Sequence, residues 1–143
     1  KAFDALKTNN MTTRNEIKKH HVSDIVKILK SSGYRFPTQH AKRIWKFGHN
    51  DIDLKTANRE ELCTINGIGM KLASFFLRNT RGEDHAVMDV HIKRWLYSKT
   101  KKKPNSLSYL EEEELFKRIA KSLGKTTTQL DLEIWQANRV GNK

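Results

Sequence analysis

Apolar residues recur at helical spacing along most of the chain. They stand three or four positions apart, which gathers them on one face of a helix instead of alternating between the two sides of a strand. This spacing, interrupted by capping and helix-ending residues, predicts a succession of helices and no strand. The predicted helices are 24–32 after an N-cap at Ser23 and before a stop at Gly33, one from Pro37-Thr38, one from Asp53 or Thr56 to about Ile65, one over 69–78, one capped by Asp89, one from a capping box at Ser108–Glu111 to about Ser122, and one opening at Thr128.

These elements predict an all-α fold, a compact helical bundle that forms a single domain over residues 1–143. A chain of this length is large enough to bury a core. It starts at Lys1 without a Met, which leaves open that an N-terminal piece precedes it. No apolar run approaches the ~20 residues of a membrane span, so we expect no membrane partner.

The composition is strongly basic. Lys and Arg number 28 against 16 Asp and Glu, which gives a formal net charge of +12. Such an excess favours a polyanionic partner, because lysines and arginines that neutralise phosphates release condensed counterions. A solubilising surface is the alternative interpretation. The run Lys99–Asn105 has the same two interpretations, a solvated connector or a phosphate contact.

Cys63 is the only cysteine, which excludes an internal disulfide and leaves no thiolates for an iron–sulfur cluster or a zinc site. We therefore expect that no cofactor is required. A single cysteine fits a reducing compartment. If the protein is prokaryotic, we expect it in the cytoplasm or the nucleoid.

Two of the predicted helices are joined by a glycine turn, Asn66-Gly67-Ile68-Gly69, in a hairpin over about 56–78. Glycine permits positive φ angles and leaves no side chain over the turn. The amides at the start of the next helix can then point at a phosphate, assisted by the helix dipole. Asn66, Gly67 and Gly69 are therefore candidate DNA-binding residues, although Gly-x-Gly alone is also common in plain helix connectors. The apolar side chains that would pack the two helices together are Leu62, Ile65, Ile68 and Leu72.

Lys71 lies just behind this turn, and Asp89 follows it farther along the chain. A lysine amine must be neutral to attack carbon, whereas an ordinary lysine pKa of about 10.4 keeps the amine charged in water. The first turn of a helix disfavours the ammonium form, and so would partial burial. A nearby carboxylate favours the ammonium form, but it would also stabilise a positively charged sugar while a glycosidic bond breaks. The pair could thus attack an anomeric carbon, form a Schiff base and eliminate the 3′ phosphate.

Each member of this pair also has a plain structural interpretation. A lysine beside a DNA-binding turn is more often a phosphate contact, and an Asp before a helix is more often only an N-cap. Taken separately, these interpretations are favoured. The combination of Lys71 and Asp89 at this spacing after the hairpin favours chemistry, so we predict that both are catalytic.

The longer string Leu62-x-x-Ile65-x-Gly67-Ile68-Gly69-x-Lys71-x-Ala73 resembles the helix-hairpin-helix DNA-binding motif. In that motif the turn carbonyls often hold a monovalent cation that helps to bridge to phosphate. The resemblance implies that the carbonyls of Leu62, Ile65 and Gly67 would hold Na⁺ or K⁺ here.

The stretch Gly67–Arg94 resembles the helix-hairpin-helix DNA glycosylases with a Gly/Pro-rich loop and a catalytic aspartate, the HhH-GPD superfamily. Lys71 matches the nucleophile of their bifunctional members, and Asp89 matches the aspartate. From about Leu6 onward the chain is similar to 8-oxoguanine DNA glycosylase/AP lyases, especially the compact archaeal-type group. Two departures are the loop His85–Met88, which lacks a proline, and the absence of the usual extra N-terminal segment. The other strings that carry the likeness are Gly33–Phe36, Phe76–Asn79, Asp89–Arg94 and Leu130–Trp135.

The resemblance implies a bifunctional repair enzyme that excises 8-oxoguanine from double-stranded DNA and cleaves at the abasic site, acting as a monomer. Two other hypotheses stay open. A non-enzymatic helix-hairpin-helix module would explain the charge and the hairpin, but it leaves Lys71 with Asp89 as a coincidence. A glycosylase for another damaged base is the second, and the missing cluster cysteines argue against its iron–sulfur branch.

Excision requires the damaged base to leave the stack and enter a pocket. Trp135 and Phe75 or Phe76 are candidate aromatic faces of that pocket, although core packing is the favoured interpretation for the two phenylalanines. Lys143, at the end of the chain, matches a lysine that the resemblance places against 8-oxoguanine.

The space left by a flipped base needs filling, and three polar residues are candidates for contacts to the orphaned cytosine. Asn9, Arg14 and Arg35 resemble the residues that human-type 8-oxoguanine glycosylases use there, with Arg35 the best match. A polar turn and a surface charge are equally good interpretations of Asn9 and Arg14. His91 would contact a phosphate or, as an alternative, orient its helix.

Overall fold

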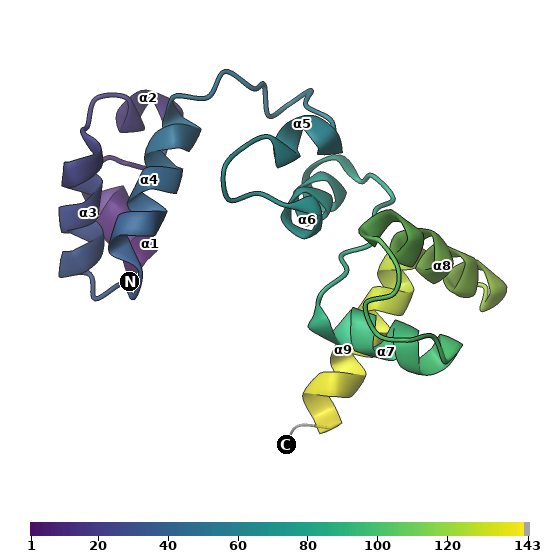
Figure 1. The fold of residues 1–143 in the computed structure, drawn as a ribbon. Coiled ribbons are helices and arrows are strands. Elements are labelled where there is room, and N and C mark those ends of the chain that lie inside the picture. The colour runs from purple at the N-terminus through teal and green to yellow at the C-terminus, as the bar shows by residue number, and fades with distance from the viewer. Residues whose placement is uncertain (142–143) are drawn as a thin grey trace. The chain divides into compact units, whose positions relative to one another are not determined.

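The computed structural model describes residues 1–141, and helices joined by loops make up this part of the chain (Figure 1). No strand occurs in the described residues, which confirms the all-α prediction. The chain divides into two compact units, residues 1–67 and 68–143, and the single domain stays a prediction. The helices are α1 (Ala2–Thr8), α2 (Arg14–Ile17), α3 (Val22–Ser31), α4 (Pro37–Gly48), α5 (Arg59–Cys63), α6 (Met70–Arg81), α7 (Val90–Thr100), α8 (Tyr109–Ser122) and α9 (Thr127–Gly141).

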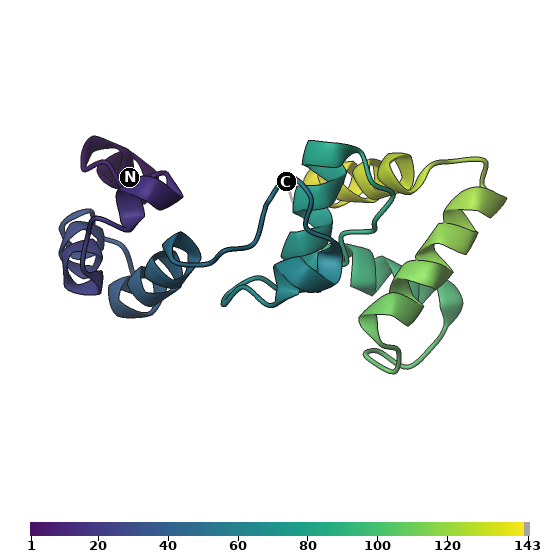
Figure 2. The same cartoon turned by 90° about the horizontal axis from the view of Figure 1, so that it is seen from above.

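In the first unit, α3 and α4 lie side by side in both ribbon views (Figures 1 and 2). Helix α1 packs on α3, and α2 packs on α4. The predicted stop at Gly33 is confirmed, because Gly33 follows α3 with a φ of +77°. The predicted start at Pro37 is confirmed too, since Pro37 is the first residue of α4. The buried core of this unit consists of Met11, Ile17, Ile25, Leu29 and Ala41.

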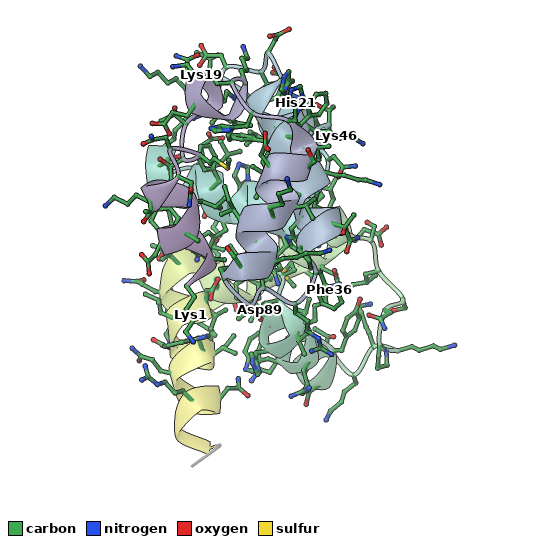
Figure 3. All side chains as sticks on the ribbon, turned by 90° about the vertical axis from the view of Figure 1, so that its left-hand side faces the viewer. Lys1, Lys19, His21, Phe36, Lys46 and Asp89 are labelled. Carbon is green, nitrogen blue, oxygen red and sulfur yellow. The ribbon has the colours of Figure 1, made fainter. Side chains whose placement is uncertain are left out.

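Several helix starts in this unit differ from the predictions. Helix α3 is capped at His21 and not at Ser23, because the Asp24 carboxylate accepts the His21 N–H at 3.0 Å (Figure 3 labels His21). Asp53 does not open a helix, since its carboxylate accepts the Lys55 N–H at 2.9 Å in an Asx turn. Helix α5 begins only after Asn58, whose side chain accepts the Glu61 N–H. The short helices α1 and α2 were not predicted.

The second unit is built around α7, α8 and α9, which contact one another. Two predicted caps are confirmed: Asp89 accepts the Ile92 N–H, and Ser108 accepts the Glu111 N–H. Helix α9 starts one residue before the prediction, because the Thr126 hydroxyl accepts the Gln129 N–H. Helix α6 runs to Arg81, beyond the predicted end. The buried core consists of Ala86, Met88, Ile92, Leu96, Phe116, Ala120, Leu130 and Ile134.

A largely buried ion pair joins α6 to α9. The Arg78 guanidinium lies 2.7 Å from the Asp131 carboxylate, and the two side chains are only 14% and 11% exposed. An ion pair in this environment is sensitive to loss of one partner, because the remaining charge is left buried. The pair therefore fixes the helix that carries Lys71 against the helix that carries Trp135. No helix in the described part of the chain is both long and apolar enough to cross a membrane.

We predict that Arg78→Met strongly destabilises the second unit, because it leaves the Asp131 carboxylate buried without its cation. Loss of one partner of a buried pair costs about 3–5 kcal/mol of unfolding free energy. The control is Arg118→Met, in an α8 pair with Glu114 whose side chains are 73% and 63% exposed; this change should cost less than about 0.5 kcal/mol. Urea denaturation of both variants measures the difference. Equal losses of unfolding free energy in the two variants would contradict the structural role of the Arg78–Asp131 ion pair.

Candidate functional site

Lys71 is the second residue of α6 and is exposed. Gly69 precedes the helix in an extended conformation and provides no side-chain cap. Among the described residues, Lys71 has no hydrogen-bond or ion-pair partner for its side chain, and its backbone N–H and that of Leu72 have no acceptor. The uncapped helix end therefore offers two backbone donors and an unpaired lysine side chain to an anion such as a phosphate.

One position of the glycine turn before α6 has a backbone conformation that favours glycine. Gly67 has a φ of +92°, whereas Gly69 has a φ of −104°, which any residue adopts. Leu62 and Ile65 are buried, as the prediction requires. Leu72 was expected to pack inside the hairpin, and this is wrong: its side chain is 49% exposed.

The carbonyls proposed for a cation come from the first unit. The Leu62 carbonyl accepts the Ile65 N–H at 3.1 Å, which leaves one of its lone pairs for another partner. The carbonyls of Ile65 and Gly67 accept no hydrogen bond from any described residue. These three oxygens fit the chemistry of a hard monovalent cation. No group of three or more His, Cys, Asp or Glu side chains in the described residues is arranged to hold a metal ion.

Asp89 is half-buried at the start of α7 (Figure 3 labels it). Its Oδ1 accepts the Ile92 N–H at 2.8 Å, and its own backbone N–H donates to the Val87 carbonyl at 2.9 Å. The second carboxylate oxygen has no hydrogen-bond partner among the described residues. Asp89 is thus both an N-cap and a source of one uncommitted negative oxygen.

The loop before Asp89 is held by α8. The Tyr109 hydroxyl donates to the Ala86 carbonyl at 2.6 Å and accepts the Met88 N–H at 3.2 Å. The buried Glu113 carboxylate accepts the Ala86 N–H at 2.9 Å. The same Tyr109 hydroxyl lies 3.4 Å from the Ser74 hydroxyl on α6. Sequence reasoning missed these contacts, because the loop groups that Tyr109 and Glu113 bind lie more than twenty residues away along the chain.

Aromatic side chains are exposed on the two helices that the Arg78 ion pair joins. Phe75 on α6 is 48% exposed and Trp135 on α9 is 44% exposed, so the core interpretation of Phe75 is wrong. Phe75 lines an open pocket of about 1090 Å³ together with Arg78 and Leu132. Trp135 lies under the Arg139 guanidinium, 5.4 Å from the ring centre. Lys143 lies outside the described residues.

The three candidates for contacts to the orphaned cytosine belong to the first unit and differ in their surroundings. Asn9 is exposed, and its amide donates to the Ala5 carbonyl at 2.8 Å. Arg14 donates to the Ile52 carbonyl and lies 4.8 Å over the Phe47 ring, so it fixes the segment that follows α4. Arg35 is exposed beside Phe36. All three assignments stay predictions, and Arg35 is the most accessible.

His91 lies in the first turn of α7 and is half-buried. Its Nδ1 is buried without a hydrogen-bond partner among the described residues. The remaining candidate DNA-binding residues lie in the glycine turn and are exposed: Asn66, Gly67 and Gly69. Their contact with DNA stays a prediction, and so does that of His91.

Comparison with known proteins gives a consistent result. A family model described as 8-oxoguanine DNA glycosylase matches residues 1–125. The 8-oxoguanine DNA glycosylase/AP lyase of Metallosphaera sedula is 35% identical over 126 residues, which cover 80% of this chain and 63% of the relative. That of Thermoplasma acidophilum is 37% identical, and the match covers 78% of this chain and 60% of the relative. The chain thus spans about three fifths of the length of these curated relatives.

Solved structures agree with the sequence matches. The crystal structure of the 8-oxoguanine DNA glycosylase of Thermotoga maritima has a TM-score of 0.66 at 28% identity, covering 93% of this chain and 68% of that chain. The Methanocaldococcus jannaschii 8-oxoguanine glycosylase/lyase, in complex with a 15mer DNA containing 8-oxoguanine, has a TM-score of 0.64 at 33% identity, covering 85% of this chain and 65% of that chain. Because the family model and the relatives match most of its length, the chain belongs to the 8-oxoguanine DNA glycosylase family.

Proposed function

We propose that this protein is a bifunctional DNA glycosylase that excises 8-oxoguanine from double-stranded DNA and then cleaves the strand at the abasic site. The observation that carries the proposal is the pair of groups in the second unit, an exposed lysine at an uncapped helix start and an aspartate with one uncommitted oxygen. Membership of the family supports it, and so does the M. jannaschii relative with 8-oxoguanine DNA.

In the proposed reaction, the neutral amine of Lys71 attacks C1′ of the damaged nucleotide. A bond from Nζ to C1′ forms as the glycosidic bond breaks, and the base departs with the bonding electrons and takes up a proton. The free oxygen of Asp89 stabilises the positive charge that develops on the sugar. The amine then loses a proton and the sugar ring opens to a Schiff base. Removal of a proton from C2′ finally expels the 3′ phosphate.

DNA binding in this proposal uses the charge of the chain and the open helix start. The amides of Lys71 and Leu72 would donate to a phosphate, next to the turn residues Gly67 and Gly69. Arg35 would contact the orphaned cytosine, because its guanidinium is exposed and the Arg14 guanidinium is engaged with Ile52. The carbonyls of Leu62, Ile65 and Gly67 would hold Na⁺ or K⁺.

The flipped base in this proposal is received by exposed aromatic side chains of the second unit. Phe75 stands one helical turn after Lys71, on the same side of α6. Trp135 offers a second face on α9. Lys143 is retained as a proposed contact to the lesion.

We predict that borohydride traps a covalent adduct between the protein and a duplex with a single 8-oxoguanine, because reduction makes the Schiff base permanent. Lys71→Gln should give no adduct, while Lys19→Gln, at an exposed lysine of the first unit, should trap as the wild type does. Gel electrophoresis measures the adduct. Absence of a wild-type adduct would refute the enzyme and favour a non-enzymatic DNA-binding module. Equal trapping on duplexes with oxidised pyrimidines would overturn the assignment of the lesion.

We predict that Asp89→Asn lowers the single-turnover rate of 8-oxoguanine excision about 100-fold or more, because the charge facing the sugar is lost. Asparagine is as good an N-cap as aspartate, so α7 and the fold should be retained. The dissociation constant for the same duplex should change less than about threefold, because Asp89 is not one of the proposed phosphate contacts. Losses of similar size in rate and in binding would refute the catalytic role of Asp89.

A further inference from the structure

The loop that presents Asp89 is non-helical and buried over residues 86–88. Buried backbone groups outside helices need hydrogen-bond partners, because each unsatisfied group costs stability. Proline would restrict such a loop covalently, and this loop has none. Something else must therefore fix the conformation of the residues that precede Asp89.

Two side chains on α8 supply that restriction. Tyr109 is the first residue of α8 and Glu113 lies four positions later, so both stand on one face of the helix. The Tyr109 hydroxyl donates to the carbonyl of Ala86 and accepts the N–H of Met88, and the Glu113 carboxylate accepts the N–H of Ala86. Three backbone groups of the loop are thus held by two side chains.

The same hydroxyl also reaches the helix of the nucleophile. Tyr109 Oη lies 3.4 Å from Ser74 Oγ, and Ser74 follows Lys71 by three positions on α6. Met88, whose N–H it accepts, directly precedes Asp89. A single oxygen atom therefore lies between the helix that carries Lys71 and the loop that carries Asp89.

We propose that Tyr109 and Glu113 are positioning residues that set the place of the Asp89 carboxylate relative to Lys71. The proposal rests on the proposed glycosylase function. Neither side chain touches the substrate; they act through the loop backbone. Misplacement of a reacting group by about 1 Å lowers a rate by about 100-fold, so loss of these hydrogen bonds acts on the step that needs Asp89.

The test uses Tyr109→Phe, which keeps the ring and removes the hydroxyl. Its matched control is Tyr97→Phe, in the same unit, where the hydroxyl donates to Glu112 at 2.8 Å and accepts the Leu107 N–H. Burial, followed by the hydrogen bond to Glu112, raises the pKa of Tyr97, so the Tyr97 hydroxyl stays protonated at neutral pH. Each variant loses one bond that the hydroxyl donates and one that it accepts from a backbone N–H, and only Tyr109→Phe affects the Asp89 loop.

Two rates are measured for each variant: single-turnover excision of 8-oxoguanine, and borohydride trapping on a preformed abasic duplex. Trapping on the abasic site depends on Lys71 but involves no breaking glycosidic bond. We expect Tyr109→Phe to lower excision about 10- to 100-fold and to leave abasic-site trapping and DNA affinity within about threefold of the wild type. Tyr97→Phe should leave all three within that range.

A second pair of variants tests Glu113. Glu113→Gln keeps an oxygen that can accept the Ala86 N–H, so it should retain most of the excision rate that Glu113→Ala loses. Equal loss of excision and trapping in Tyr109→Phe would overturn the proposal in favour of general destabilisation, and so would wild-type excision in both Tyr109→Phe and Glu113→Ala. A wild-type protein that neither excises nor traps would instead refute the proposed function.

Discussion

The hydrogen bonds from α8 to the backbone of residues 86–88 are the constraint on which the candidate site of the second unit depends. Ala86 and Met88 belong to the core of this unit, so the loop is also fixed by apolar packing. Tyr109 and Glu113 satisfy backbone groups that a buried loop would otherwise leave without partners. Asp89 directly follows this segment and caps the N-terminus of α7. Packing, hydrogen bonding and capping therefore act on consecutive residues.

The two candidate catalytic groups make no direct contact with each other through an ion pair or hydrogen bond of the described residues. No ion pair joins Lys71 to Asp89 or to any other described carboxylate. A contact ion pair would favour the ammonium form of a lysine, which cannot attack carbon. One carboxylate oxygen of Asp89 accepts the Ile92 N–H, and the other has no hydrogen-bond partner among the described residues. This arrangement suits a carboxylate that faces a cationic sugar and an amine that DNA covers on binding.

The sequence predicted those features of the fold and the site that depend on contacts between neighbouring residues. Asp89 caps α7, Pro37 opens α4 and Gly33 ends α3, because each of these residues acts on its immediate neighbours. The predicted helix start at Asp53 was wrong, because the Asp53 carboxylate caps a turn instead of a helix. Tyr109 and Glu113 could not be found from sequence: their partners lie more than twenty residues away, and only the fold brings them together.

In the proposed reaction Lys71, and no other amine, bonds to the sugar of the damaged nucleotide. The most direct measurement is mass-spectrometric peptide mapping of the borohydride-trapped wild-type complex after digestion of both protein and DNA. We expect a reduced sugar remnant on the peptide that contains Lys71, with every other lysine and the N-terminal amine unmodified. A remnant located on a different amine, or spread over several, would contradict the proposed reaction.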